Sequence, residues 1–254
     1  MTEPGFFGQV AEWFTDPGNW SGAFGVPNRL LEHLIMSGVS VAIAAAIALP
    51  LGMWIGHTRR FERLVVSITN LGRAIPSFGL LFLFVLAFGI GLRYPASLRP
   101  AVIFALVLLA IPPIITNTYV GIQGVDEDTL EAARGMGMRE RTVLLRIEVP
   151  LAAPLIMAGL RTAAVQVVAT ASLAAVVAGG GLGRFIIDGF ATGDRPQIFG
   201  GAVLVAVLAI LTEVAFGLVE RVASPRTSSA GRAKREDRPY EHAGQAPRPA
   251  DMGW

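Results

Sequence analysis

The pattern of apolar positions along the chain predicts five membrane-spanning helices. A helix that crosses the hydrocarbon layer of a bilayer needs about 20 mainly apolar residues. Five stretches of the sequence reach that length with few charged side chains: Leu31–Gly56, Leu64–Gly91, Pro100–Gln123, Leu151–Leu182 and Ile198–Glu220. The fourth stretch is longer than the layer requires, so we expect one of its ends to lie outside the lipid. The predicted fold class is therefore an all-α membrane protein, a bundle with about five transmembrane helices.

The segment before the first span, residues 1–29, has a different composition. It carries Glu3, Glu12 and Asp16 and has no continuous apolar core, so it does not have the pattern of a signal peptide. Its aromatic residues include Trp13, Phe14, Trp20 and Phe24. Such residues are typical of the membrane interface, and we expect an extracytoplasmic, interfacial segment. A floppy, partly apolar terminus is an equally open interpretation.

The distribution of basic residues predicts which side of the membrane each loop faces. With the N-terminus outside, the segments that would lie inside carry 14 Lys and Arg residues, and those outside carry 5. This excess follows the positive-inside rule, although it falls to 7 against 5 when the C-terminal segment is left out. We therefore expect the C-terminus to be cytoplasmic. Residues 223–254 are rich in Ser, Pro, Arg and Glu without an apolar period, which predicts a disordered tail. Its basic residues could rest on anionic lipid, or the tail could be solvated and have no role.

Composition and charge exclude several other classes of protein. Hydrophobic residues make up 53% of the 254 residues and charged residues 16%, and the net charge is only +2. The chain has no cysteine, so it can hold neither a disulfide nor a thiolate metal site. Its three histidines, His33, His57 and His242, are scattered and lack the spacing of a metalloprotease site. We expect no enzyme activity, no metal, no cofactor and no nucleic-acid partner.

The segment 124–150 between the third and fourth spans predicts a helix–turn–helix outside the lipid. Asp128 and Glu131 have the spacing of a capping box for a first short helix. Gly135 and Gly137 then permit a sharp turn. A second short helix is expected over 139–148, with Val143, Leu144 and Ile147 on one face, before Pro150 begins the next span. A compact element that exposes small and apolar residues suggests a docking surface for a partner, although a plain linker remains the alternative.

The same segment resembles the EAA loop of permeases in binding-protein-dependent ABC importers of type I. The matching positions are Glu131, Ala132, Ala133, Gly137, Ile147 and Pro150, with Val149 where Leu is usual. The resemblance implies that a coupling helix in the loop docks on a cytoplasmic ATP-binding subunit, with Gly135 among the coupling residues. It also implies five or six core helices, a bacterial cell membrane, a solute-binding protein outside and a second permease chain. ATP hydrolysis would then belong to a separate subunit.

Three further segments resemble the osmoprotectant branch of these permeases. They are Arg73–Leu83, Ile111–Met138 and Val176–Phe190, so the likeness covers a permease domain over about residues 30–222. It implies import of glycine betaine, choline, carnitine or a proline-type solute. A permease for methionine or another amino acid is the alternative, and an ion-coupled secondary transporter is a second one of a different class.

Polar residues within the spans are candidates for lining a translocation pathway. Charged groups at membrane depth are costly and usually face a bundle interior or a water-filled cavity. We expect Glu213 to pair with either Arg73 or Arg161, while snorkelling to the inner surface is the competing interpretation. The candidate pathway residues are Asn70, Arg73, Pro76, Ser77, Asn117, Arg161 and Glu213.

Two glycine patterns carry further expectations. Gly179, Gly180, Gly181 and Gly183 follow the fourth apolar stretch, where a bend could form part of an external gate or simply end the helix. In the first span, Gly38, Ala42 and Ala46 repeat every four residues, a spacing that lets helices approach closely.

Overall fold

The computed structural model describes residues 5–60, 67, 76–89, 94–177 and 179–223, and every regular element among them is helical. Four helices are long and apolar enough to cross a membrane: α3 (Val26–Thr58), α6 (Pro100–Gln123), the run Glu140–Val177 that contains α9 (Val149–Ala171), and α11 (Arg195–Ala223). A shorter apolar helix, α5, covers Ser77–Phe88. The predicted all-α membrane fold is confirmed, and the about five expected spans compare with four long helices and the shorter α5 among the described residues.

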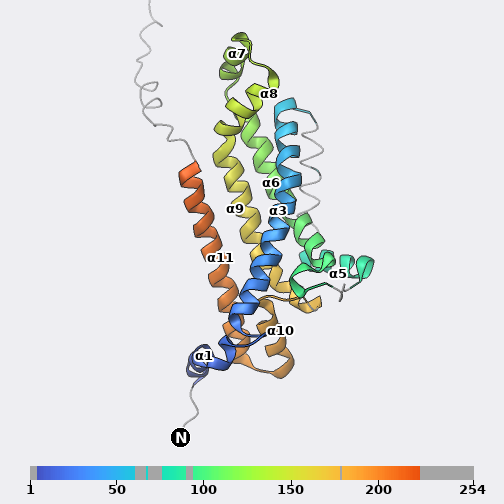
Figure 1. The fold of residues 1–254 in the computed structure, drawn as a ribbon, viewed down its shortest axis with the longest axis vertical. Coiled ribbons are helices and arrows are strands. Elements are labelled where there is room, and N and C mark those ends of the chain that lie inside the picture. The colour runs from blue at the N-terminus through green and yellow to red at the C-terminus, as the bar shows by residue number, and fades with distance from the viewer. Residues whose placement is uncertain (1–4, 61–66, 68–75, 90–93, 178, 224–254) are drawn as a thin grey trace, which may run out of the picture. The chain divides into compact units, whose positions relative to one another are not determined.

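Shorter elements lie before, between and after these helices. They are α1 (Phe6–Thr15), α2 (Pro17–Trp20), η1 (Ala96–Leu98), α7 (Glu127–Gly135), α8 (Glu140–Val143), η2 (Leu144–Glu148), η3 (Ser172–Val177) and α10 (Gly183–Thr192). In Figure 1, α7 and α8 lie at one end of the helices, which we call the loop end, and α1 and α10 lie at the other, the α1 end.

The expected span boundaries agree with the structure to different degrees. The third span, Pro100–Gln123, has the expected limits, whereas α3 and α11 extend a few residues beyond theirs at both ends. The fourth was expected to reach Leu182, but its α-helix ends at Ala171 and continues as the tighter 3₁₀ turn η3. The first part of the second stretch, apart from residue 67, lies outside the described residues, as do Asn70, Arg73 and the C-terminal tail.

Small residues let α3 and α6 pack closely. A Cβ added at Gly52 would lie 2.7 Å from the Thr118 Cβ, and one at Gly56 would lie 2.6 Å from the Ile122 Cβ. Five buried small residues of α3 repeat every four positions: Ser40, Ala44, Ala48, Gly52 and Gly56. The stripe expected to pack, Gly38, Ala42 and Ala46, is exposed instead. Both stripes have the same period, and the position of α6 decides which one is buried, so sequence spacing could not distinguish them.

The N-terminal segment is folded against the α1 end. Trp13 of α1 is buried, meets the Phe185 ring edge to face at a centroid distance of 5.4 Å, and packs on Gly200 of α11. Val26, Leu182 and Leu208 belong to the same apolar cluster. For the described residues of this segment, the interpretation as a floppy terminus is therefore wrong, because Trp13 and Phe14 pack into an apolar cluster with α10 and α11.

Candidate functional site

The helix α7 is attached to the loop end by a small apolar cluster of its own. Leu130 and Ala133 are buried together with Val125 and Val143, and Met138 and Ile147 pack against the group. Gly137 closes the turn after α7 with φ +82, a conformation that residues other than glycine adopt at a cost. The expected helix and glycine turn are therefore present, and Ala133 and Ile147 face the cluster rather than the surroundings.

The N-terminal cap of α7 differs from the capping box that the sequence predicted. The helix begins at Glu127 with Asp126 as its N-cap, and no side chain caps the backbone there. Thr129 donates its hydroxyl hydrogen to the Asp126 carboxylate at 3.4 Å. The capping box at Asp128 is wrong because Asp128 already lies within the first helical turn, where its charge still favours the helix dipole.

The opposite face of α7 is exposed. Glu131, Ala132, Gly135 and Gly137 are exposed, and Met136 at the turn is 76% exposed. These residues combine small, apolar and acidic groups on one short helix and its turn. The loop can therefore offer a shallow surface to another chain without unfolding.

The second helix of the loop is not separate. It begins at Glu140 as α8, widens into the π-helical turn η2 and continues without a break into α9. Pro150 lies in the first turn of α9 and is exposed. A proline has no N–H to donate to the preceding turn, and π turns are one way in which a helix accommodates such a gap. A helix is therefore present over nearly the expected residues, but it is continuous with the fourth span and not separate from it.

An ion-pair network connects the end of α3 to this loop, and sequence reasoning did not find it. The His57 Nδ1 lies 2.7 Å from the Glu148 Oε2, and its Nε2 lies 3.4 Å from the Glu140 Oε2. Arg134 donates two hydrogen bonds to Glu140, of 2.9 and 3.2 Å, and these raise the pKa of the Arg134 guanidinium. His57 and Glu148 are 91 residues apart in the sequence, so no local pattern could have indicated their contact.

A second ion-pair group joins α9 to α11. Arg161 pairs with Glu213, as predicted, and also with Glu220 at 3.2 Å. The Arg161 guanidinium passes Gly217 of α11, where an added Cβ would lie 3.7 Å from its central carbon. Arg161 and Glu213 are 35% and 44% exposed, so this group lies on the surface of the helices and not within their core.

The other candidate pathway residues within the described part of the chain do not join this group. Asn117 donates to the Pro113 carbonyl at 2.8 Å, and its Cβ lies where α6 crosses α9 at Gly159. Pro76 is exposed before α5, and Ser77 borders a small cavity of about 10 Å³ lined mainly by apolar side chains. Among the described residues, no three His, Asp or Glu side chains gather in a way that could hold a metal ion.

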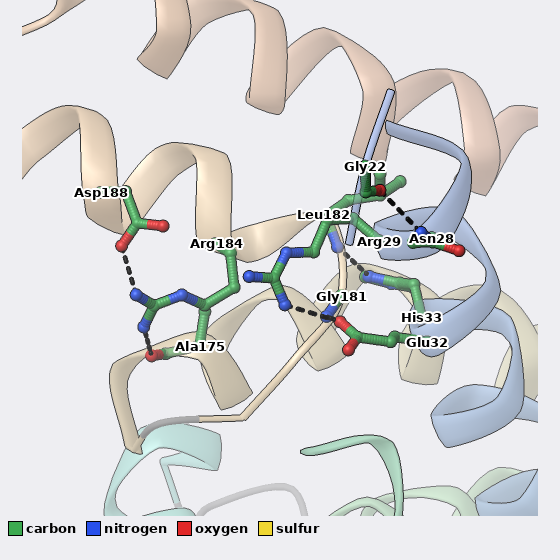
Figure 2. A network of polar contacts seen from close by, with 10 residues as sticks. All are labelled: Gly22, Asn28, Arg29, Glu32, His33, Ala175, Gly181, Leu182, Arg184 and Asp188. Carbon is green, nitrogen blue, oxygen red and sulfur yellow. Dashed lines mark hydrogen bonds and ion pairs between the residues drawn. The ribbon is translucent and has the colours of Figure 1, made fainter. Parts of the chain in front are cut away.

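The glycine run at the α1 end is held by α3 through backbone hydrogen bonds (Figure 2). The Gly181 N–H donates to the Glu32 carboxylate at 2.9 Å, and the Leu182 N–H donates to the His33 Nδ1 at 3.2 Å. The His33 Nε2 donates to the Val168 carbonyl at 2.9 Å, since that carbonyl can only accept. Gly181 has φ +87.

Close packing surrounds the rest of this run. A Cβ on Gly180 would meet the Glu32 carboxylate, and one on Gly183 would meet the Ser172 carbonyl. Gly179 lies against Ala174 of η3 in the same way. The run thus forms a tight loop between η3 and α10, not the plain end of a long helix. Arg184 of α10 donates to the Ala175 carbonyl at 3.3 Å and pairs with Asp188, which fixes the start of α10.

Sequence comparison identifies the family to which this helical membrane protein is similar. Residues 48–229 match the family described as "Binding-protein-dependent transport system inner membrane component". The chain is 37% identical over 218 residues to a carnitine transport permease protein, OpuCD, of Listeria monocytogenes, covering 85% of this chain and 92% of that one. It is 36% identical over 197 residues to a choline transport system permease protein, OpuBB, of Bacillus subtilis, covering 78% and 88%.

Solved structures show the same fold. An inward-facing conformation of the MetNI methionine ABC transporter matches with a TM-score of 0.69 at 21% identity, covering 83% of this chain and 100% of the matched chain. An amino acid ABC transporter with histidines matches with a TM-score of 0.61 at 21% identity. The chain belongs to the permeases of binding-protein-dependent ABC importers, in their osmoprotectant branch: it is a multi-pass component of a bacterial inner membrane, and ATP hydrolysis belongs to a separate subunit.

Proposed function

We propose that this permease imports a quaternary ammonium osmoprotectant, such as glycine betaine, choline or carnitine, that a separate binding protein delivers. Relatives at 34 to 37% identity are named for choline, carnitine and glycine betaine transport. The methionine transporter shares the fold at only 21 to 23% identity and so does not favour an amino acid over these solutes. A proline-type solute or an amino acid is the second candidate.

The loop end faces the cytoplasm in this proposal, and the exposed face of α7 binds the ATP-binding subunit. The observation that carries the proposal is the construction of α7: Leu130 and Ala133 are buried against its own chain, while Glu131, Ala132 and Met136 are exposed. A helix held on one side and open on the other can transmit the movement of a partner. A second permease chain completes the transporter, whose pathway lies between the two.

Copurification tests the docking face. Glu131→Lys and Gly137→Asp should each abolish copurification of the ATP-binding subunit, because each changes the charge of the face that would contact it. Gly137→Asn has nearly the same backbone demands as Gly137→Asp without the charge, so it should retain more binding. The matched control is Glu12→Lys, the same exchange at an exposed glutamate of α1. Full retention of the subunit by both charged variants would contradict the proposal.

The solute is tested with the complex reconstituted in vesicles. ATP hydrolysis should be stimulated when the binding protein is loaded with glycine betaine, choline or carnitine, and less or not at all with methionine. Stimulation by methionine alone would favour the second candidate.

Arg161 and Glu213 are proposed to face the water-filled pathway and not lipid. Arg161 lies about 18 Å along the helix from the start of α9, at about 1.5 Å per residue, and half-exposed charges at such depth are costly in hydrocarbon. Because the chain has no cysteine, a single Gly217→Cys substitution can be probed with a small water-soluble thiol reagent. Labelling at Gly217→Cys but not in a matched Leu211→Cys variant would support the proposal, and equal protection of both would overturn it.

Charge reversal is a second test of the same pair. Glu213→Arg should impair transport, and adding Arg161→Glu to it should restore transport.

The pathway and gate roles of the remaining candidates belong to the same proposal. The tight loop that contains Gly179, Gly180, Gly181 and Gly183 lies at the α1 end, which would be the outer side. Asn117 and Ser77 lie on helices that pack around the core, where small changes of position would alter the pathway between two chains.

A further inference from the structure

The last turn of α3 contacts three separate parts of the loop. His57 faces Glu148 of η2 and Glu140 of α8, and Arg59, directly after the helix, lies 3.7 Å from Glu127 at the start of α7. These three glutamates lie at the beginning, the middle and the end of the loop. One short piece of α3 is therefore attached to the whole element that binds the ATP-binding subunit in the proposed function.

The Glu148 carboxylate makes His57 the central member of this group. Glu148 is only 2% exposed, whereas Glu140 is 57% exposed and His57 is 16% exposed. A buried carboxylate without a partner is strongly unfavourable, so its contact with the His57 ring is required and not incidental. The imidazole has a carboxylate oxygen at each nitrogen, and only its doubly protonated form offers an N–H to both.

The connection continues from the end of α3 into the core. Gly56, next to His57, packs against Ile122 and the Tyr119 carbonyl of α6, and Gly52 packs against Thr118 one turn earlier. The contacting side chains, Thr118 and Ile122, are β-branched and stiff, and the Tyr119 contact is with backbone. A displacement of the last turn of α3 must therefore move α6 as well.

We propose that His57 is a positioning residue that ties α3 to the coupling loop through Glu148 and Glu140, so that loop movement is passed to the α3–α6 pair. This inference rests on the proposed function, since it assigns the path by which the docked subunit moves the spans. Arg134 extends the same path to α7, because it donates to both carboxylate oxygens of Glu140, one of which also faces His57.

The test compares variants in the complete transporter reconstituted in vesicles with its ATP-binding subunit and loaded binding protein. His57→Gln removes the imidazole ring and Glu148→Gln removes the carboxylate charge, each keeping a hydrogen-bonding group, and His57→Lys places a permanent cation opposite the two carboxylates. Four quantities are measured: copurification of the ATP-binding subunit, basal ATP hydrolysis, hydrolysis stimulated by binding protein, and solute uptake per ATP hydrolysed. Arg60→Gln is the control, because Arg60 is an exposed cation three residues from His57 for which no ion pair is found among the described residues.

The expected result separates attachment from transmission. His57→Gln should retain the ATP-binding subunit and basal hydrolysis but lose about tenfold in uptake per ATP, within the range typical of coupling between sites. Adding Glu148→Gln to it should cause little further loss, and His57→Lys should recover most of the uptake. A variant that only folded less well would lower uptake and hydrolysis together and leave their ratio unchanged.

Different outcomes would overturn different statements. Uptake per ATP at the wild-type level in both His57→Gln and Glu148→Gln would overturn the inference, as would losses that simply add in the double variant. Failure of the wild-type chain to bind the ATP-binding subunit would instead overturn the proposed function. If Glu148→Gln does not accumulate in the membrane, the comparison of His57→Gln with His57→Lys still decides the inference.

Discussion

The two ends of α3 hold their neighbours by different means. At the α1 end, Glu32 and His33 accept hydrogen bonds from the backbone N–H groups of Gly181 and Leu182, and His33 donates to the Val168 carbonyl. At the loop end, His57 and Arg59 contact the side chains of glutamates. The first set of contacts fixes the course of a loop, whereas the second joins elements through side chains that can change rotamer.

The contacts at the two ends of α3 also differ in how deeply they are buried. His33 is fully buried, and a backbone group that loses its partner there has no water to replace it. Apart from Glu148, the charged groups at the loop end are partly or well exposed, and exposed pairs exchange partners at little cost. We therefore expect the α1 end of α3 to be the fixed end and the loop end to be the one that adjusts when a partner moves.

The largest effect is expected from His33→Leu. This substitution leaves the Leu182 N–H and the Val168 carbonyl without their side-chain partner in a buried site, which should cost about 4 kcal/mol of the free energy of unfolding. Denaturant titration in detergent micelles measures it. His33→Gln, whose amide can replace one of the two lost hydrogen bonds, should cost about half as much. An unchanged unfolding midpoint in His33→Leu would show that the α1 end is not fixed by these bonds.

At the loop end, Leu130→Ala should act locally. Leu130 is buried in the small cluster under α7, and truncating a buried leucine costs about 3 kcal/mol. Because this cluster is separate from the main core, we expect faster hydrogen exchange over 127–137 with little change in global unfolding. Leu145→Ala is the control, since Leu145 is a half-exposed residue of the same loop. Uniformly faster exchange throughout the helices would mean that the loop end is not a separate unit.

Two glycines with nearly the same backbone conformation sharpen the comparison. Gly181 has φ +87 and Gly137 has φ +82, but an added Cβ would lie 2.9 Å from the His33 Nδ1 at Gly181 and meets nothing within 4 Å at Gly137. Gly137→Ala should therefore cost only the backbone strain, about 1 kcal/mol, and Gly181→Ala about 2 kcal/mol. Unfolding measured under the same conditions compares them directly. Equal losses would show that contact with His33 adds nothing to the conformational requirement.

The sequence predicted those features that depend on local spacing. The long apolar stretches predicted the spans, because length and continuous apolarity suffice for that. Gly137 predicted the turn after α7, because the backbone there has a left-handed conformation, whereas Gly135 is the last residue of the helix itself. Glu213 was expected to pair with an arginine because an isolated charge within a span is costly, and Arg161 is that partner.

Other features depended on partners that are distant in the sequence. The stripe Gly38, Ala42 and Ala46 was expected to pack, yet the stripe through Ala44 and Ala48 is buried, because α6 lies on that side. The His57–Glu148 pair joins the end of one span to the beginning of another, and neither residue has a local signature. Pro150 suggested a break before the fourth span, whereas the π turn before it keeps the helix continuous.

The smallest effect is expected from Arg134→Gln. The Arg134–Glu140 pair is about half exposed on both sides, and such surface pairs contribute about 0.5 kcal/mol or less. The loss should shrink further between low and high salt, because mobile ions screen exposed charges. Unfolding titrations of the wild type and the variant at two ionic strengths measure both quantities. A loss above about 2 kcal/mol that persists at high salt would place this pair with the buried contacts of the α1 end, and the distinction between a fixed and an adjustable end of α3 would then fail.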